Sequence, residues 1–215
     1  MSDKANIVAS VLARLRNSSK SSGAPFQQVL QQYAIERFLY RLSKSQHAQG
    51  IDFGVGDVMV PGPRKIDYPT FLAGDTIPLL AYPVESAIAE KLQAMVALGD
   101  SNSRMKDFYD VWMCSQHLDF ASDVLRGAIS ATFNNRETSV LAADFEALTA
   151  NFVAQHQVQW NAFGKKIGED TLVDQLAVIV QDIKNFAMPV FRSPARREKF
   201  AQRWTPGNEW RSSGN

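Results

Sequence analysis

Residues 83–117 hold two apolar helical patterns separated by only four residues. The apolar positions recur at spacings of three and four, at Ile88, Leu92, Met95 and Val96 in the first pattern and at Met105, Phe108, Val111 and Trp112 in the second. The turn between them, Gly99–Asn102, offers Ser101 or Asn102 as a cap for the second helix. A turn this short leaves little choice of geometry, so the sequence predicts an antiparallel helix pair.

The remaining patterns are also mainly helical. They predict helices before Asn17, over residues 26–43, 123–133, 142–152, 158–163 and 172–186, with Asn17–Pro25 as a connection and Pro189 closing the last helix. Strand spacing occurs only over residues 51–58 and 77–81, and the proline-containing residues 59–70 are expected to form an extended loop. We therefore expect an α-rich α/β fold. Because a sheet of two short strands is marginal alone, either the protein is mostly helical or part of a sheet is missing.

Composition indicates an ordinary globular chain with one core, or at most two small ones. Of 215 residues, 45% are hydrophobic and 21% charged, which argues against disorder. No apolar run approaches the roughly 18 residues needed to cross a bilayer, and no apolar segment of a secretory signal follows the first residues. Cys114 is the single cysteine, so an intrachain disulfide is excluded, as fits a reducing cytoplasm.

The net charge of +1 hides an asymmetry along the chain. Residues 1–49 and 184–215 each carry seven Lys/Arg against two Asp/Glu, whereas residues 50–150 carry seven against fourteen. An acidic centre could hold a divalent metal, and basic flanks could meet a polyanion. The alternative is that these charges form solvated helix faces.

The expected strand at residues 51–58 contains a candidate metal ligand. Asp52 lies between apolar Ile51 and Phe53 and close to Gly54 and Gly56, which in a strand often mark a close backbone or ligand approach. A carboxylate there could bind Mg²⁺. The alternative is an aspartate at a strand edge.

The helix pair contains the second group of candidate residues. Lys91 borders the apolar stripe of the first helix, and Arg104, Asp107 and Asp110 follow one side of the second at intervals of three. Antiparallel packing would bring Lys91 towards Asp107 or Asp110. A lysine beside carboxylates fits nucleotide chemistry, but it also fits an ion-pair cluster that only joins two helices.

Several stretches resemble the AbiEii/AbiGii family of nucleotidyltransferase toxins. They are Ala34–Ser43 (AIERFLYRLS), Ile51–Asp57 (IDFGVGD), Leu80–Leu92 (LAYPVESAIAEKL) and Arg104–Asp110 (RMKDFYD), and Trp204–Gly207 is also similar. The last two of the four are together quite specific, and the resemblance covers most of the chain.

The resemblance implies a minimal nucleotidyltransferase fold and a toxin of a toxin–antitoxin or abortive-infection system that acts against phage. Such enzymes transfer nucleotides from NTP to RNA, with transfer RNA as the expected acceptor, and use Mg²⁺. By this resemblance, Lys91 and Arg104 would contact substrate phosphates, and Asp107 or Asp110 would support catalysis. Asp52 would be a carboxylate beside the site and a weak ligand of the metal. A cognate antitoxin would be a partner, in the cytoplasm and not at a membrane.

One part of the family pattern is missing. Family members place a Gly-Gly or Gly-Ser turn and an Asp-x-Asp pair after the first motif, to cradle phosphate and to hold Mg²⁺. This sequence has neither turn before Gly50 and has no Asp-x-Asp pair, and only five residues separate Ser45 from Ile51. An internal deletion of two strands and the metal-binding pair explains both the departure and the shortage of strands.

We therefore expect three segments: an N-terminal helical segment (residues 1–48), a remnant nucleotidyltransferase core with the helix pair (49–118) and a helical C-terminal region (119–215). Transfer of nucleotides to RNA should be impaired. The alternative function is a non-catalytic protein that keeps the antitoxin-binding or RNA-binding surface of the toxin.

Overall fold

The computed structural model describes residues 2–43, 58–70, 76–139, 145–168, 175–192, 202–207 and 209–212. The chain forms two compact units, Met1–Val55 with Arg64–Ala81, and Gly56–Pro63 with Tyr82–Asn215. We call them the N-terminal unit and the C-terminal unit and describe each by itself. The three-segment division expected from the sequence stays a prediction.

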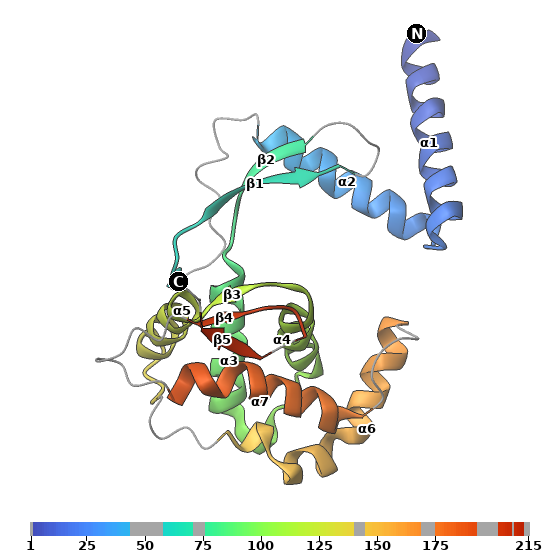
Figure 1. Ribbon diagram of the computed structural model, residues 1–215. Coiled ribbons are helices and arrows are strands. Elements are labelled where there is room, and N and C mark those ends of the chain that lie inside the picture. The colour runs from blue at the N-terminus through green and yellow to red at the C-terminus, as the bar shows by residue number, and fades with distance from the viewer. Residues whose placement is uncertain are drawn as a thin grey trace. The chain divides into compact units, whose positions relative to one another are not determined.

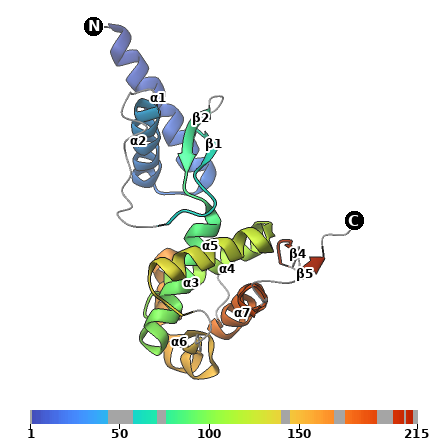
Figure 2. The ribbon, with the colours of Figure 1, turned by 90° about the vertical axis from the view of Figure 1, so that its left-hand side faces the viewer.

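The N-terminal unit contains two helices and a hairpin. Its elements are α1 (Ser2–Ser22), α2 (Phe26–Ser43), β1 (Arg64–Pro69) and β2 (Thr76–Ala81). The strands pair antiparallel, with Ile66 opposite Leu79, and β2 lies beside α2 (Figures 1 and 2). Leu15, Val29 and Ile77 are buried, one from each of α1, α2 and β2, so the small core of this unit draws on both helices and the hairpin.

Two expectations for this unit were wrong. The connection after the first helix is only Gly23–Pro25, because α1 continues to Ser22, where the Ser22 hydroxyl donates to the Ser18 carbonyl and Gly23 takes a left-handed φ of 71°. The proline-containing segment is not all loop, since residues 64–69 pair with the expected strand at 77–81. The prolines at positions 61, 63 and 69 gave this segment the local pattern of a loop, and pairing with residues 76–81 makes part of it a strand.

The C-terminal unit is a helical assembly with a small sheet. Its elements are α3 (Val84–Leu98), the 3₁₀ turn η1 (Gly99–Ser101), α4 (Met105–His117), β3 (Phe120–Ala121), α5 (Ser122–Asn135), the 3₁₀ turn η2 (Glu146–Leu148), α6 (Ala150–Ile167), α7 (Leu176–Arg192), β4 (Gln202–Trp204) and β5 (Trp210–Ser212). The expected helix pair, α3 and α4, is confirmed. Helix α3 packs against α4 and α5, and α7 packs against α4, α5 and α6 (Figure 1).

One large apolar core joins these helices. Fully buried Leu92, Phe108, Phe133, Trp160 and Phe186 come from five different helices. The three short strands pair antiparallel in the order β3-β4-β5, with Phe120 opposite Trp204 and Trp204 opposite Trp210. The sheet thereby anchors the end of the described chain to the residues that follow α4. The α-rich α/β class expected from the sequence is confirmed.

Three expectations for the C-terminal unit were wrong. Pro189 lies inside α7 and does not end it, and Phe191 beyond it packs against Phe133 and Phe145, which holds the last turn in place. The helix expected over residues 142–152 begins only at Ala150, where the Thr149 hydroxyl accepts from the Phe152 amide as a cap. Strands at 120–121, 202–204 and 210–212 were not expected at all.

Candidate nucleotide site on the α3–α4 helix pair

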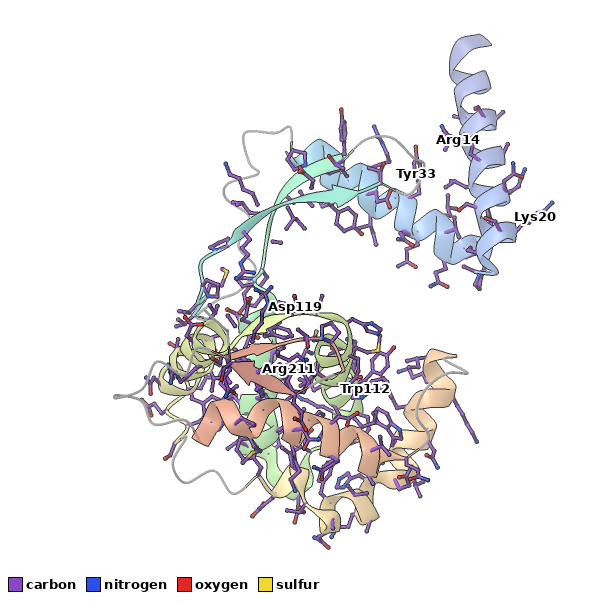
Figure 3. All side chains as sticks on the ribbon, in the orientation of Figure 1. Arg14, Lys20, Tyr33, Trp112, Asp119 and Arg211 are labelled. Carbon is purple, nitrogen blue, oxygen red and sulfur yellow. The ribbon has the colours of Figure 1, made fainter. Side chains whose placement is uncertain are left out.

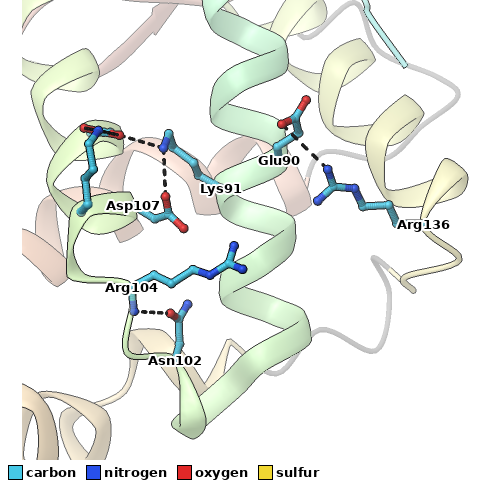
Figure 4. Close-up of polar contacts among 8 residues, drawn as sticks. Glu90, Lys91, Asn102, Arg104, Asp107 and Arg136 are labelled. Carbon is cyan, nitrogen blue, oxygen red and sulfur yellow. Dashed lines mark hydrogen bonds and ion pairs between the residues drawn. The ribbon is translucent and has the colours of Figure 1, made fainter. Parts of the chain in front are cut away.

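The turn between α3 and α4 fixes how the two helices face each other. The Asn102 side chain is buried and its Oδ1 accepts from the Arg104 amide at 2.9 Å, which orders the turn (Figure 4). The expectation that Ser101 or Asn102 caps the second helix was wrong, because Arg104 occupies the capping position of α4 and no side chain caps the helix. Gly99 has a φ of 50°, and a Cβ there would collide with the Glu146 carboxylate. Glycine is therefore required at the start of this turn.

Lys91 lies between the two carboxylates of α4. Its Nζ is 2.9 Å from Asp107 Oδ1 and 2.7 Å from Asp110 Oδ2 (Figure 4). Lys106, one helical turn from Asp110, donates to the same Asp110 Oδ2 at 2.6 Å. The expected contact between Lys91 and the acidic edge is confirmed. We call Lys91, Lys106, Asp107 and Asp110 the charge cluster.

The charge cluster is sheltered from solvent in part. The side chains of Lys91, Asp107 and Asp110 are 25%, 15% and 22% exposed. Burial alone would raise the pKa of Asp110, but hydrogen bonds and charge from Lys106 and Lys91 hold this pKa below its ordinary value. Burial alone would lower the pKa of Lys91, but Asp110 and Asp107 raise it above its ordinary value. Lys91 and Asp110 are therefore charged at neutral pH.

Arg104 differs from the lysines of the charge cluster. It was expected beside Asp107, yet Asp107 pairs with Lys91, and the exposed Arg104 guanidinium makes no ion pair within the described residues. Figure 4 shows its side chain lying in front of α3, beside the charge cluster. In the part of the chain that the structure describes, Arg104 is thus a cation beside the charge cluster that forms no ion pair with a carboxylate.

A second polar network on α3 was not foreseen. Glu90 accepts a hydrogen bond from the Tyr82 hydroxyl and lies 3.8 Å from Arg136 Nη2 (Figure 4). Arg136 also donates to Gln93 Oε1 at 2.9 Å, and Gln93 donates to the Thr138 hydroxyl at 2.8 Å. This network ties the end of α5 to α3. No local pattern could have revealed the contacts between α3 and the end of α5, because Gln93 lies 43 positions from Arg136 and 45 positions from Thr138.

The remaining candidate, Asp52, lies outside the described residues, as does the whole strand expected at residues 51–58 except Val58. Within the described part, no group of three or more His, Cys, Asp or Glu side chains is arranged to hold a metal ion. The two carboxylates of the charge cluster are each bound to an ammonium group at 2.6–2.9 Å. Only two carboxylates are present and the Lys91 ammonium group lies between them, where its positive charge would repel a divalent cation, so this donor set does not fit a divalent metal.

Comparison with known proteins gives one match. Residues 5–187 match a family model described as the nucleotidyl transferase AbiEii toxin of a type IV toxin–antitoxin system. No curated protein and no solved structure matches the chain. In the part of the chain that the structure describes, no helix is long and apolar enough to cross a membrane.

Proposed function

Because this chain belongs to the AbiEii family of nucleotidyl transferase toxins of type IV toxin–antitoxin systems, we propose that it binds NTP at the α3–α4 pair and that its transfer of nucleotides to RNA is impaired. Family membership implies a cognate antitoxin as partner. The proposal extends to transfer RNA as the acceptor, and to phage defence in the cytoplasm as the setting.

The observation that carries the proposal is the pairing of Lys91 with two carboxylates next to an unpaired Arg104. Phosphates need cations, and Arg104 offers a planar guanidinium that suits two phosphate oxygens. Lys91 is held in one place by Asp107 and Asp110, at 2.9 and 2.7 Å, so it can approach a phosphate without first becoming ordered. These residues support binding of the triphosphate.

The proposed impairment of nucleotide transfer follows from the way the carboxylates of the charge cluster are bound. In-line transfer from NTP requires a well-held divalent metal to offset charge on the transferred group. Asp107 and Asp110 are bound to ammonium groups, and the sequence contains no Asp-x-Asp pair. Asp52 remains the proposed metal ligand on the expected strand, and a single carboxylate would hold Mg²⁺ weakly.

Calorimetric titration with ATP, with and without Mg²⁺, tests this function. We expect weak binding that Mg²⁺ does not strengthen, and Arg104→Ala should weaken it further. Lys165→Ala is the matched control, since Lys165 is also an exposed cation but lies on α6, outside the α3–α4 pair, and it should leave binding unchanged. Tight, Mg²⁺-dependent binding would contradict the proposed impairment, and equal effects of the two substitutions would contradict the role of Arg104.

The second candidate function is a non-catalytic protein that keeps the toxin's antitoxin-binding or RNA-binding surface. The observation in its favour is that the charge of Lys91 is already offset by Asp107 and Asp110. Under this alternative the charge cluster is purely structural. It predicts no ATP binding at all, with retention of the cognate antitoxin on the purified protein.

A further inference from the structure

The C-terminal unit contains an open-sided cavity that the candidate nucleotide site does not use. It lies between α7, the end of α4 and the β4–β5 hairpin, and has a volume of about 730 Å³. Pockets for small ligands usually measure roughly 300–1,000 Å³. None of the charge cluster residues lines this cavity, which we call the hairpin cavity.

An indole held in a fixed position forms part of its wall. Trp210 stacks on Phe186, with 5.9 Å between ring centroids and 14° between planes, and its Nε1 donates to the Phe186 carbonyl at 2.8 Å. Trp204 lies against Trp210, and its own Nε1 donates to the Ser115 carbonyl. Trp210 is only partly buried and lines the hairpin cavity. A preoriented aromatic surface of this kind suits stacking by a planar ligand.

Carboxamides supply the polar part of the lining. Gln116, Gln181, Asn185 and Gln202 all border the hairpin cavity. Gln181 donates one hydrogen bond to Asn185 across one helical turn, at 2.9 Å. A pair of carboxamides has four N–H donors and two carbonyl acceptors, so this pair keeps both donors and acceptors for a ligand. Carboxamides can bond the edge of a nucleobase through a donor and an acceptor at once.

The charges of the lining point to a neutral group. Lys184 lines the hairpin cavity together with the carboxylates of Asp182 and Glu209, so the lining carries more acidic than basic groups and does not favour an anion. Phosphates would be better placed on the other face of the hairpin. There Arg211 lies directly across from Arg203, which is paired with Asp119 at 3.1 Å. Arg211 and Asp119 are labelled in Figure 3. Residues 184–215 as a whole carry seven Lys/Arg against two Asp/Glu.

We propose that the hairpin cavity binds an unpaired nucleobase of single-stranded RNA, stacked beside Trp210 and bonded by Gln181 and Asn185, while basic residues near the cavity contact the phosphates. Recognition of single-stranded RNA generally combines aromatic stacking, hydrogen bonds to base edges and a basic track for the backbone. The inference deepens the proposed function and rests on it for the choice of RNA, because it assigns the acceptor a place on the protein.

The test is fluorescence anisotropy with a labelled, unstructured RNA oligonucleotide, in EDTA and without NTP. The double substitution Gln181→Ala with Asn185→Ala should weaken binding about fivefold or more, since each lost hydrogen bond is worth about 1 kcal/mol. Both residues are exposed, so the fold should persist, as a melting curve would check. Asn161→Ala is the matched control, because Asn161 is the acceptor of the same i,i+4 carboxamide pair on α6, with Gln157 as donor, and does not line the cavity.

A second experiment distinguishes the contribution of the base to binding from that of the phosphates. An abasic RNA of the same length should bind at least about tenfold more weakly, because stacking of one base contributes about 1–3 kcal/mol. The proposal would be overturned if abasic and complete RNA bound equally well, or if the double variant kept the affinity of the wild type. It would also be overturned if the wild type did not bind RNA and the double substitution instead abolished antitoxin binding. Since the assay excludes NTP and metal, it does not depend on NTP binding, and RNA binding by a protein that does not bind ATP in calorimetry would count against the proposed function alone.

Discussion

The charge cluster and the hairpin cavity are both polar regions of the C-terminal unit, but they differ in how completely their groups are paired. In the charge cluster, four side chains neutralise one another at 2.6–2.9 Å. In the hairpin cavity, an ordered indole and several carboxamides surround open space. Groups that satisfy one another chiefly stabilise the fold, whereas ordered groups with remaining donors and acceptors are available to a ligand. We therefore expect substitution of the paired carboxylates in the charge cluster to act chiefly on stability, and substitution of the carboxamides in the hairpin cavity to act chiefly on ligand binding.

The largest effect on stability should come from the residue beneath the hairpin cavity. Trp204 is 3% exposed, packs against Phe186 and donates to the Ser115 carbonyl. Trp204→Ala should lower the free energy of unfolding by about 3–5 kcal/mol, measured by urea denaturation. Trp210→Phe, at the partly buried neighbour, is the control and should cost less than about 1.5 kcal/mol. Similar losses of unfolding free energy for the two variants would show that Trp204 does not hold the cavity wall in place.

A smaller loss is expected in the charge cluster. Asp110→Ala removes a partner from both Lys91 and Lys106 and should lower the free energy of unfolding by about 1–3 kcal/mol. Asp119→Ala removes the more exposed ion pair with Arg203 and should cost less than about 1 kcal/mol. A cost for Asp110→Ala no greater than that for Asp119→Ala would mean that the charge cluster does not stabilise the helix pair.

The contribution of Asp110 should depend on pH. Its pKa lies below the ordinary value of 3.8 in the folded protein, so its stabilising effect is present above that pH and is lost as the pH falls through the folded pKa. The stability difference between the wild type and Asp110→Asn should stay constant near neutral pH and shrink in acid. Urea titrations at a series of pH values measure it, and a difference that persists undiminished at pH 2 would contradict the assignment.

The raised pKa of Lys91 affects the stability of the fold only at alkaline pH. Its stabilising effect is present below the ordinary value of 10.5 and is lost as the pH rises through the folded pKa, so no change from Lys91 is expected near neutral pH.

The smallest effect is expected for Lys106, whose side chain is 72% exposed. Its pair with Asp110 spans one helical turn, and such pairs stabilise by only about 0.3–0.5 kcal/mol. Lys106→Ala should therefore leave the thermal midpoint almost unchanged, whereas Lys91→Ala should lower it. Equal shifts in a thermal melt would show that shelter from solvent does not distinguish the two lysines.

The contacts of the charge cluster could be predicted from the sequence, whereas the hairpin cavity could not. Helix phase and a four-residue turn predicted the contact of Lys91 with Asp107 and Asp110, because those residues are positioned by local structure. The hairpin cavity depends on pairing between Phe120 and Trp204, 84 positions apart, for which no local pattern exists.

At two of the misjudged helix boundaries, local composition indicated an end that the helix does not have. Asn17–Ser22 has turn-forming composition, yet it is the last part of α1, and Pro189 is a helix breaker by propensity, yet α7 continues to Arg192. In α7, packing of Phe191 against Phe133 and Phe145 outweighs the local preference. The role of Arg104 in binding and that of Asp52 in holding metal stay predictions.

Incorporation of labelled nucleotide from NTP into total transfer RNA, with Mg²⁺, tests most directly whether the chain is an impaired nucleotidyltransferase. The measurement is made on the wild type and on Asp110→Ala, together with their thermal midpoints. We expect the wild type to label RNA at close to background, because Asp107 and Asp110 are bound to lysines and no Asp-x-Asp pair is present, and we expect the variant to be equally silent but less stable. Strong labelling by the wild type, with a variant that is silent yet equally stable, would contradict both the impairment and the structural role of Asp110.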